Sequence, residues 1–174
     1  MVEIFPLAKL ADAEIEAILD AAFGSDRRGR TAYRLRAGMA AIPELSFVVI
    51  VGGAAAGTVQ CWPVAHCGED GKVTPLVMVG PVAVMPDQQA RGLGRRLMDM
   101  VMAAAPSHAD GALMMIGDPD YYGRFFGFSG AKTGAWRLPG PVEPHRLLAA
   151  AVGGHAVPDA PGEIGPRLAA MLAR

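Results

Sequence analysis

The sequence has few charged residues, few aromatic side chains and only two cysteines. Charged residues make up 19% of the 174 residues and the formal net charge is −1. This balance gives no global electrostatic reason to expect nucleic acid or an anionic membrane as a partner. Cys61 and Cys67 fit neither a secreted disulfide framework nor a four-ligand metal spacing. We expect two buried, reduced thiols, and no metal, since His66 and Cys67 are neighbours that a strand would point to opposite faces.

Targeting and membrane-spanning signals are also missing. The first 23 residues carry acids throughout and lack a basic region followed by an unbroken apolar run, so we expect no signal peptide and a cytoplasmic location. The segment 46–68 is uncharged and long enough to raise the question of a membrane span. Because it contains Gly52, Gly53, Gln60, Pro63 and His66, two buried strands joined by a turn at Gly52 and Gly53 explain it better.

Hydrophobic residues make up 52% of the sequence, which predicts a compact fold. The length suits one domain over residues 1–174, with a core of about 1–138 and a Pro- and Gly-rich tail, 139–174, with weakly helical pieces. The tail could cover the core or contribute to a homodimer, and the sequence does not choose between these roles.

The hydrophobic pattern changes its period along the chain. Helices are expected at 12–23, 31–39 and from about Leu93 to Ala105, the last with an apolar stripe of Leu93, Leu97, Met100, Val101 and Ala104. A short helix is expected near 121–125. Strands are expected at 2–5, 45–51, 55–64, 73–84, 112–116 and 133–138.

The segment from Gln89 to Gly94 lies between an expected strand and an expected helix. Backbone N–H groups at a helix start lack intrahelical partners, and the helix dipole attracts negative charge. Gly92 and Gly94 let the chain bend and let a bulky anion approach the backbone. A pyrophosphate group is the expected ligand of this segment.

This segment, with Val82–Val84 before it and Arg95–Leu97 after it, resembles the pyrophosphate-binding pattern of the GNAT superfamily of N-acetyltransferases. The resemblance implies an α/β (α+β) fold: one domain with a mixed, mostly antiparallel central sheet flanked by helices and splayed between its fourth and fifth strands. It also implies that acetyl-CoA is the acyl donor and that the preceding strand pairs with the pantetheine arm. The residues assigned to coenzyme binding are Val82, Ala83, Val84, Gln89, Ala90, Arg91, Gly92, Leu93, Gly94 and Arg95.

Gly80 and Pro81 predict a distortion in the strand that precedes the loop, because proline cannot donate to a β-ladder. The alternative is that Pro81 merely starts a strand. In the family the equivalent strand opens a slot for the coenzyme, and a main-chain N–H there can polarise the thioester carbonyl.

A second segment, Gly117 to Phe128, resembles the family's short helix with a tyrosine ahead of a Gly-Phe pair. The resemblance implies a tyrosine that protonates the departing thiolate. Tyr122 is the first candidate and Tyr121 the second, since this stretch is one residue longer than the pattern. A phenol with a pKa of about 10 is protonated at neutral pH and can donate without tuning. Both tyrosines could instead only pack, and Phe125, Phe126 and Phe128 are expected in the core.

The implied reaction is direct attack of a primary amine, of a small molecule or protein, on the acetyl thioester. Glu44, His66 and Asp118 are candidate bases, and their spacing selects none. The alternative is a non-catalytic acetyl-CoA-binding sensor or regulatory module. A nucleotide-binding oxidoreductase is disfavoured because the third glycine of its fingerprint is missing. The arginines between residues 27 and 36 could recognise an acidic substrate or RNA, but a solvated surface is the preferred interpretation: Arg27, Arg28, Arg30, Arg34 and Arg36.

Overall fold

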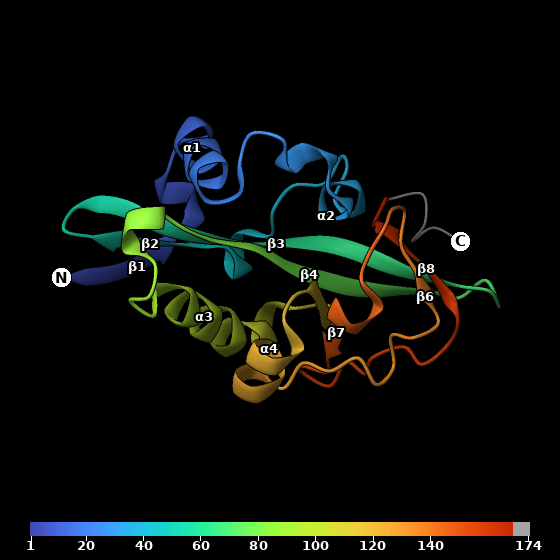
Figure 1. Ribbon diagram of the computed structural model, residues 1–174. Helices are drawn as coiled ribbons and strands as arrows, with labels where there is room; N and C mark the ends of the chain where they lie inside the picture. Colours follow the sequence, from blue (N-terminus) through green and yellow to red (C-terminus); the bar gives the residue numbers. More distant parts are fainter. Residues whose placement is uncertain (169–174) are drawn as a thin grey trace. The chain divides into compact units, whose positions relative to one another are not determined.

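The computed structural model describes residues 1–168, which form four α-helices and eight strands joined by short 3-10 turns (Figure 1). The helices are α1 (Asp12–Phe23), α2 (Thr31–Leu35), α3 (Leu93–His108) and α4 (Pro119–Phe126). The strands are β1 (Val2–Pro6), β2 (Phe47–Val51), β3 (Ala54–Gly68), β4 (Val73–Val84), β5 (Ala112–Ile116), β6 (Trp136–Arg137), β7 (Leu147–Ala150) and β8 (Gly162–Pro166). Up to residue 168, the helices are all too short or too polar to cross a membrane.

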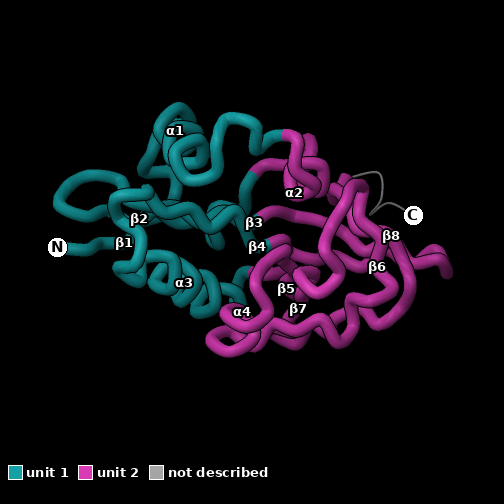
Figure 2. Tube along the Cα trace, in the orientation of Figure 1, with its two compact units in different colours: residues 1–28, 41–61, 79–108 teal, residues 29–40, 62–78, 109–174 magenta. Residues whose placement is uncertain are grey.

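The chain divides into two compact units, coloured teal and magenta in Figure 2. Unit 1 contains residues 1–28, 41–61 and 79–108, and unit 2 contains 29–40, 62–78 and 109 onward. Strands β3 and β4 contribute residues to both units. A single domain over the whole chain stays a prediction.

The strands are ordered β1-β2-β3-β4-β5-β7, with β8 beside β3 and β6 beside β8. The pairs β1/β2, β2/β3, β3/β8 and β5/β7 are antiparallel, whereas β4/β5 and β6/β8 are parallel. The predicted mixed, mostly antiparallel sheet is therefore confirmed. The β4/β5 register runs from Leu76 opposite Ala112 to Met78 opposite Met114, and among the described residues it is not continued beyond Met78. A splay between the two strands requires the pairing to stop in this way.

Unit 1 is a layered structure with α1 and α3 on opposite faces of its strands (Figure 1). The hairpin between β2 and β3 turns at Gly52 and Gly53, whose φ angles of 57° and 85° suit a two-residue loop, as expected from the sequence. Under α1, a buried cluster joins the helix to β2 and β4 and includes Ile15, Leu19, Val48 and Ala83. This cluster fixes one face of β4 against the core.

The apolar stripe predicted for α3 is partly wrong. Leu93, Leu97 and Val101 are buried as expected, but Met98 and Ala105 replace Met100 and Ala104 in the fully buried set. Met100 is 36% exposed. Several neighbouring positions of a helix lie close to its buried face, and packing against β2 determines which of these side chains are fully buried.

The expectation for the tail after Leu138 is also wrong, because the tail forms strands rather than helical pieces. Strand β7 pairs with β5 and β8 pairs with β3. Leu147, Ala149 and Ile164 enter the core cluster of unit 2. Residues 169–174 of the predicted tail lie outside the described residues.

Three predicted elements differ in length. Helix α2 ends at Leu35 instead of residue 39. After Leu35 the N–H groups of Ala37 and Met39 bond to carbonyls three residues earlier, and Gly38 has a φ of 76°, so the α-helix does not continue. Strand β3 continues to Gly68 instead of 64, because β8 supplies a partner for its last five residues. Only Trp136 and Arg137 of the segment 133–138 form a strand, since Thr133 is held in a turn by its hydrogen bonds to Gly130 and Leu147.

Candidate functional site

The end of β4 presents two different faces. The Ala83 side chain is fully buried in the cluster under α1. Its neighbours Val82 and Val84 therefore point to the other face, because successive side chains of a strand alternate. There they approach Gly94 at the start of α3, where a Cβ atom would lie 3.7 Å from Val82 Cγ1 and 3.8 Å from Val84 Cγ2. The two valines thus support the first turn of the helix.

The loop between β4 and α3 is exposed over Gln89–Gly92, and Leu93 anchors its end in the core. Gly92 has a φ of 72°, which side chains rarely adopt, and Ala90 reaches 66°. The carbonyl of Gly92 accepts the N–H of Arg96 at 3.1 Å. The preceding amides point along the helix axis without intrahelical partners. A helix start of this kind can bind an anion, and the pyrophosphate site assigned to it from the sequence stays a prediction.

Gly94 is not required by packing. The contact distances for an added Cβ are ordinary van der Waals contacts, so alanine would fit the fold. Its φ is not in the left-handed region, in contrast to Gly92.

Strands β3 and β4 approach closely beside the loop. A Cβ on Gly57 would lie 2.6 Å from the carbonyl oxygen of Ala83, so only glycine fits. The β2/β3 register shifts between Val49 and Ile50, which leaves Ala56 as an extra residue, and its carbonyl accepts the N–H of Met85 at 2.8 Å. Further along β4, the peptide bond from Gly80 to Pro81 is cis and Gly80 has a φ of 126°. The backbone is therefore irregular where the sequence predicted a distortion.

The two predicted tyrosines lie in unit 2, at the start of α4. The Asp118 side chain caps the helix by accepting the N–H of Asp120 at 2.9 Å, and Gly127 ends it in the left-handed conformation. The ring of Tyr122 occupies the space over Gly117, where an added Cβ would lie 2.7 Å from the ring. Tyr121 packs edge-on against Tyr122, with 4.9 Å between ring centroids.

Burial raises the pKa of Tyr122, and the neighbouring Tyr121 adds to this while Arg146 opposes it. Tyr122 thus holds its proton to higher pH than a free phenol. The prediction that the nearby phenylalanines are core is confirmed for Phe128, which is buried, but it is wrong for Phe125, which is 38% exposed. Phe125 lies on the outer side of α4, beside Arg124.

The structure separates the three candidate bases by their surroundings. His66 is buried against Trp136, and its Nε2 lies 2.9 Å from the carbonyl oxygen of Ala160. Asp118 serves as a helix cap. Glu44 is exposed in the turn before β2. Through residue 168, no three His, Cys, Asp or Glu side chains gather as a metal site.

The thiols differ from the prediction that both are buried. Cys61 is buried, and desolvation raises the pKa of its thiol against the opposing effect of a backbone hydrogen bond from Gly80. Cys67 is only partly buried, because it lies near the end of β3 opposite Glu163 of β8.

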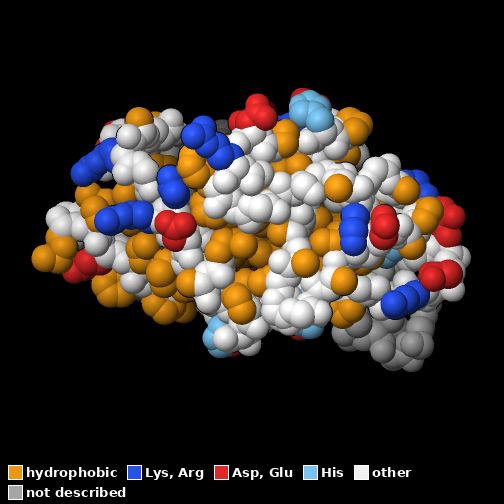
Figure 3. Space-filling view, turned by 90° about the horizontal axis from the view of Figure 1, so that it is seen from below, with side chains coloured by type: hydrophobic (Ala, Val, Ile, Leu, Met, Phe, Trp, Pro, Cys, Tyr) orange, Lys and Arg blue, Asp and Glu red, His pale blue; other side chains and the backbone are white. Residues whose placement is uncertain are grey.

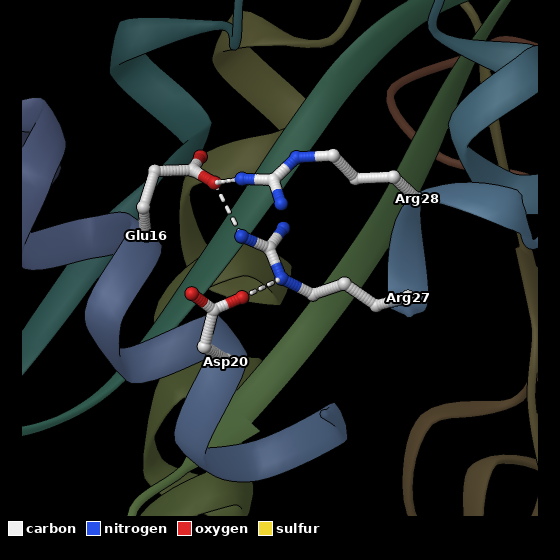
Figure 4. A network of polar contacts seen from close by, with 4 residues as sticks. All are labelled: Glu16, Asp20, Arg27 and Arg28. Atoms are coloured by element: carbon white, nitrogen blue, oxygen red, sulfur yellow. Dashed lines mark hydrogen bonds and ion pairs between the residues drawn. The ribbon is translucent and has the colours of Figure 1, made fainter. Parts of the chain in front are cut away.

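The interpretation of the arginines as a solvated surface is wrong for Arg27 and Arg36. Arg27 is fully buried and donates from Nε to Asp20 at 2.8 Å and from Nη2 to Glu16 (Figure 4). Arg28, which is exposed, reaches the same Glu16 carboxylate at 2.5 Å. The acids are one helical turn apart on α1, so the pair Glu16 and Asp20 was the available sequence signal.

Arg36 is 8% exposed and stacks between Tyr33 and Trp62, with its guanidinium carbon 4.0 Å and 4.2 Å from the ring centroids. Stacking on two aromatic faces is a common environment for a guanidinium. No local pattern predicts this stacking, because Trp62 is distant from Arg36 along the chain.

Sequence reasoning also missed two buried polar side chains of β3, Thr58 and Gln60. Both side chains point to the same face of the strand, since they are two residues apart. Their polar alternation inside an otherwise apolar strand was the signal that could have revealed them.

Charge on the surface is mixed. Basic and acidic side chains both occur on the face that Figure 3 shows, with hydrophobic side chains between them. This arrangement agrees with the net charge of −1.

Comparison with known proteins identifies the family. The model of the acetyltransferase (GNAT) family matches residues 13–128, and no curated protein matches the chain. A GNAT family acetyltransferase from Brucella melitensis, solved in complex with acetyl-CoA, has a similar structure with a TM-score of 0.66; it is 23% identical, and the alignment covers 96% of each chain. The GNAT family N-acetyltransferase YhbS from Escherichia coli, solved in complex with CoA, gives a TM-score of 0.67 at 23% identity, over 100% of this chain and 92% of that one. These likenesses establish the shared fold, and because the family model covers well over half of the sequence, the chain belongs to the acetyltransferase (GNAT) family.

Proposed function

We propose that the chain is an acetyl-CoA-dependent N-acetyltransferase that transfers an acetyl group to a primary amine by direct attack. The observation that carries the proposal is the helix start at Gly92–Gly94. The loop before it is exposed, Gly92 needs its left-handed conformation, and Gly94 leaves open a position where a side chain would fit. The structures of the Brucella melitensis and Escherichia coli proteins, which have the same fold, were solved with acetyl-CoA and CoA respectively. This likeness supports acetyl-CoA as the ligand of the chain.

The residues of this chain would divide the work as follows. Amides from Gln89 to Arg95 bind the pyrophosphate, and Val82–Val84 align the pantetheine arm along β4. Bound acetyl-CoA supplies the thioester carbonyl that the amine attacks. A main-chain N–H near Val82 stabilises the developing oxyanion. Much of the rate enhancement comes from holding the two reactants together.

Tyr122 is proposed as the proton donor to the leaving sulfur. Its raised pKa favours the protonated form at neutral pH. Gly117 supports this role, because it provides the space in which the Tyr122 ring is held. Tyr121 is the second candidate.

The experiment that tests coenzyme binding is calorimetric titration with acetyl-CoA and, separately, NADH. The variant Gly92→Glu places bulk and negative charge in the loop. Gly71→Glu is a matched control, because Gly71 is also an exposed glycine with positive φ and open space around it. Binding of acetyl-CoA by the wild type and by Gly71→Glu, lost in Gly92→Glu, supports the site. A wild type that does not bind acetyl-CoA contradicts the proposed function.

Catalysis is tested by thiol release from acetyl-CoA with a panel of amines, including benzylamine, glycinamide, lysine amide and spermidine. Turnover with any primary amine supports the acetyltransferase. Tight binding of acetyl-CoA without turnover across the panel would instead favour the non-catalytic sensor or regulatory module.

A further inference from the structure

Three buried polar atoms of β3 have no hydrogen-bond partner among the described residues: the hydroxyl oxygen of Thr58, the amide oxygen of Gln60 and the indole nitrogen of Trp62. The two oxygens can accept hydrogen bonds, whereas the indole nitrogen can only donate one. Thr58 is fully buried and Gln60 is 7% exposed. A buried polar group without a partner destabilises a fold, and most are satisfied in folded proteins. The oxygens of Thr58 and Gln60 lie two residues apart on the same face of β3, and the geometry points to a ligand that donates a hydrogen bond to each.

These atoms lie on the face of unit 1 that α1 covers. Thr58 is directly opposite Val48 in the β2/β3 register, and directly opposed residues share a face. Val48 belongs to the buried cluster with α1 and Ala83. Gln60, two residues further along β3, therefore points to that face too.

The same part of β3 lies beside the stretch of β4 expected to hold the thioester. Gly57, which precedes Thr58, meets the carbonyl of Ala83, and the thiol of Cys61, which follows Gln60, shares a hydrogen bond with the backbone of Gly80. Because one contact precedes Thr58 and the other follows Gln60, the segment from Thr58 to Gln60 lies alongside Gly80–Ala83. The polar atoms of Thr58 and Gln60 thus flank the strand segment whose main-chain N–H is proposed to stabilise the oxyanion.

We infer that Thr58 and Gln60 bind the amino group of the acceptor and select primary amines. This inference rests on the proposed function. A neutral primary amine attacks through its lone pair and keeps two N–H groups, and each oxygen can accept one of them. The C–N bond then forms, the C–S bond breaks, the amine loses one proton to a base, and the departing sulfur gains one from the donor.

The geometry allows one nitrogen to reach both oxygens. Residues two apart on a strand have Cα atoms about 6.6 Å apart, and the longer Gln60 side chain can shorten the gap between the two oxygens. A secondary amine keeps only one N–H during attack, so it leaves one oxygen without a partner. A site built to satisfy buried polar groups rejects an analogue that lacks the matching donor.

The test uses Thr58→Val and Gln60→Met, which remove the polar atoms and keep the side-chain volume. We expect the KM for the best primary amine of the panel to rise about tenfold or more in each variant, with acetyl-CoA affinity unchanged. Melting temperatures should stay equal or rise, because an unsatisfied polar atom is removed. Thr133→Val is the matched control: its hydroxyl donates to Leu147 at 2.7 Å, so its loss should lower the melting temperature.

Unchanged KM values with lower melting temperatures would overturn the inference, since that result assigns the two atoms to internal structure. A measurement on the wild type remains if the variants do not fold. The primary amine should exceed its N-methyl analogue in kcat/KM, and equal values would overturn the inference. Turnover without these effects refutes this inference alone, whereas absence of acetyl-CoA binding refutes the proposed function with it.

Discussion

At the residue scale, substitution of Gly94 tests coenzyme binding without disturbing the fold. An alanine there makes ordinary contacts with Val82 and Val84, so Gly94→Ala should fold with nearly unchanged stability. Its methyl group would enter the space between the helix start and Val82 and Val84, along which the coenzyme is proposed to bind, and we expect acetyl-CoA affinity to fall about tenfold or more, which is about 1.4 kcal/mol. Titration calorimetry measures the loss. Gly134→Ala, at another glycine with open surroundings, is the control, and equal affinities in the two variants would contradict the role of Gly94.

Tyr122 and Tyr121 are distinguished by a pair of hydroxyl deletions. Tyr122→Phe should lower kcat about 100-fold, because the proton donor is lost while the ring remains. Tyr121→Phe should retain most of the activity. Steady-state kinetics with the best amine decide between them, and the reverse order of effects would move the donor to Tyr121.

The pH dependence follows from the raised pKa of Tyr122. A phenol donates only while protonated, so its contribution to kcat persists through neutral pH and is lost as the pH rises through the raised pKa. The same sign applies to stability: the folded chain keeps the proton longer than the unfolded chain, so stability falls as the pH rises above about 10. A wild-type kcat that does not decline as the pH rises above about 10, or a decline that is the same in Tyr122→Phe, would contradict the assignment.

At the scale of elements, the buried Arg27 joins α1 to the segment that follows it. Arg27→Met removes the hydrogen bonds to Glu16 and Asp20, and we expect a loss of about 1–3 kcal/mol in the free energy of unfolding. Arg28→Met should change it by less than about 0.5 kcal/mol, because that side chain is exposed. Urea unfolding of both variants checks the difference, and equal losses would contradict the structural role of Arg27.

The same network makes stability depend on pH. Burial acts to raise the pKa of Glu16, but hydrogen bonds and charge from Arg27 and Arg28 outweigh it, so the pKa is lowered. The stabilisation is therefore present above the unfolded pKa of Glu16 and is lost as the pH falls through its lowered folded value. Urea unfolding of the wild type and Arg27→Met should converge at acid pH. A constant difference between them down to acid pH would indicate that Arg27 acts by packing alone.

At the scale of the whole molecule, the strands after Leu138 complete the core of unit 2. Ending the chain after Leu138 removes the strand that pairs with β5 and the core residues Leu147, Ala149 and Ile164. We expect the shortened chain to lose cooperative thermal unfolding, because the exposed edge and apolar surface have no cover. Circular dichroism melting measures this, and a cooperative transition near that of the full chain would show that the strands after Leu138 are dispensable.

The sequence by itself determined what depends on local pattern. The period of apolar residues located α1, β4 and β5, and paired glycines located the β2/β3 turn. The loop from Gln89 to Gly94 was placed correctly before a helix start, because helix-start geometry is set by neighbouring residues, and its anion-binding role stays a prediction. Only the tertiary structure decided what depends on distant partners. Arg27 can be buried because Glu16 and Asp20 form ion pairs with it. The tail forms strands because β3 and β5 have edges with which it can pair. Thr58 and Gln60 share the face of β3 that lies opposite Val48 of β2, and this pairing joins separate segments of the chain. Charge burial and strand pairing are properties of contacts between distant segments, and a one-dimensional pattern does not contain them.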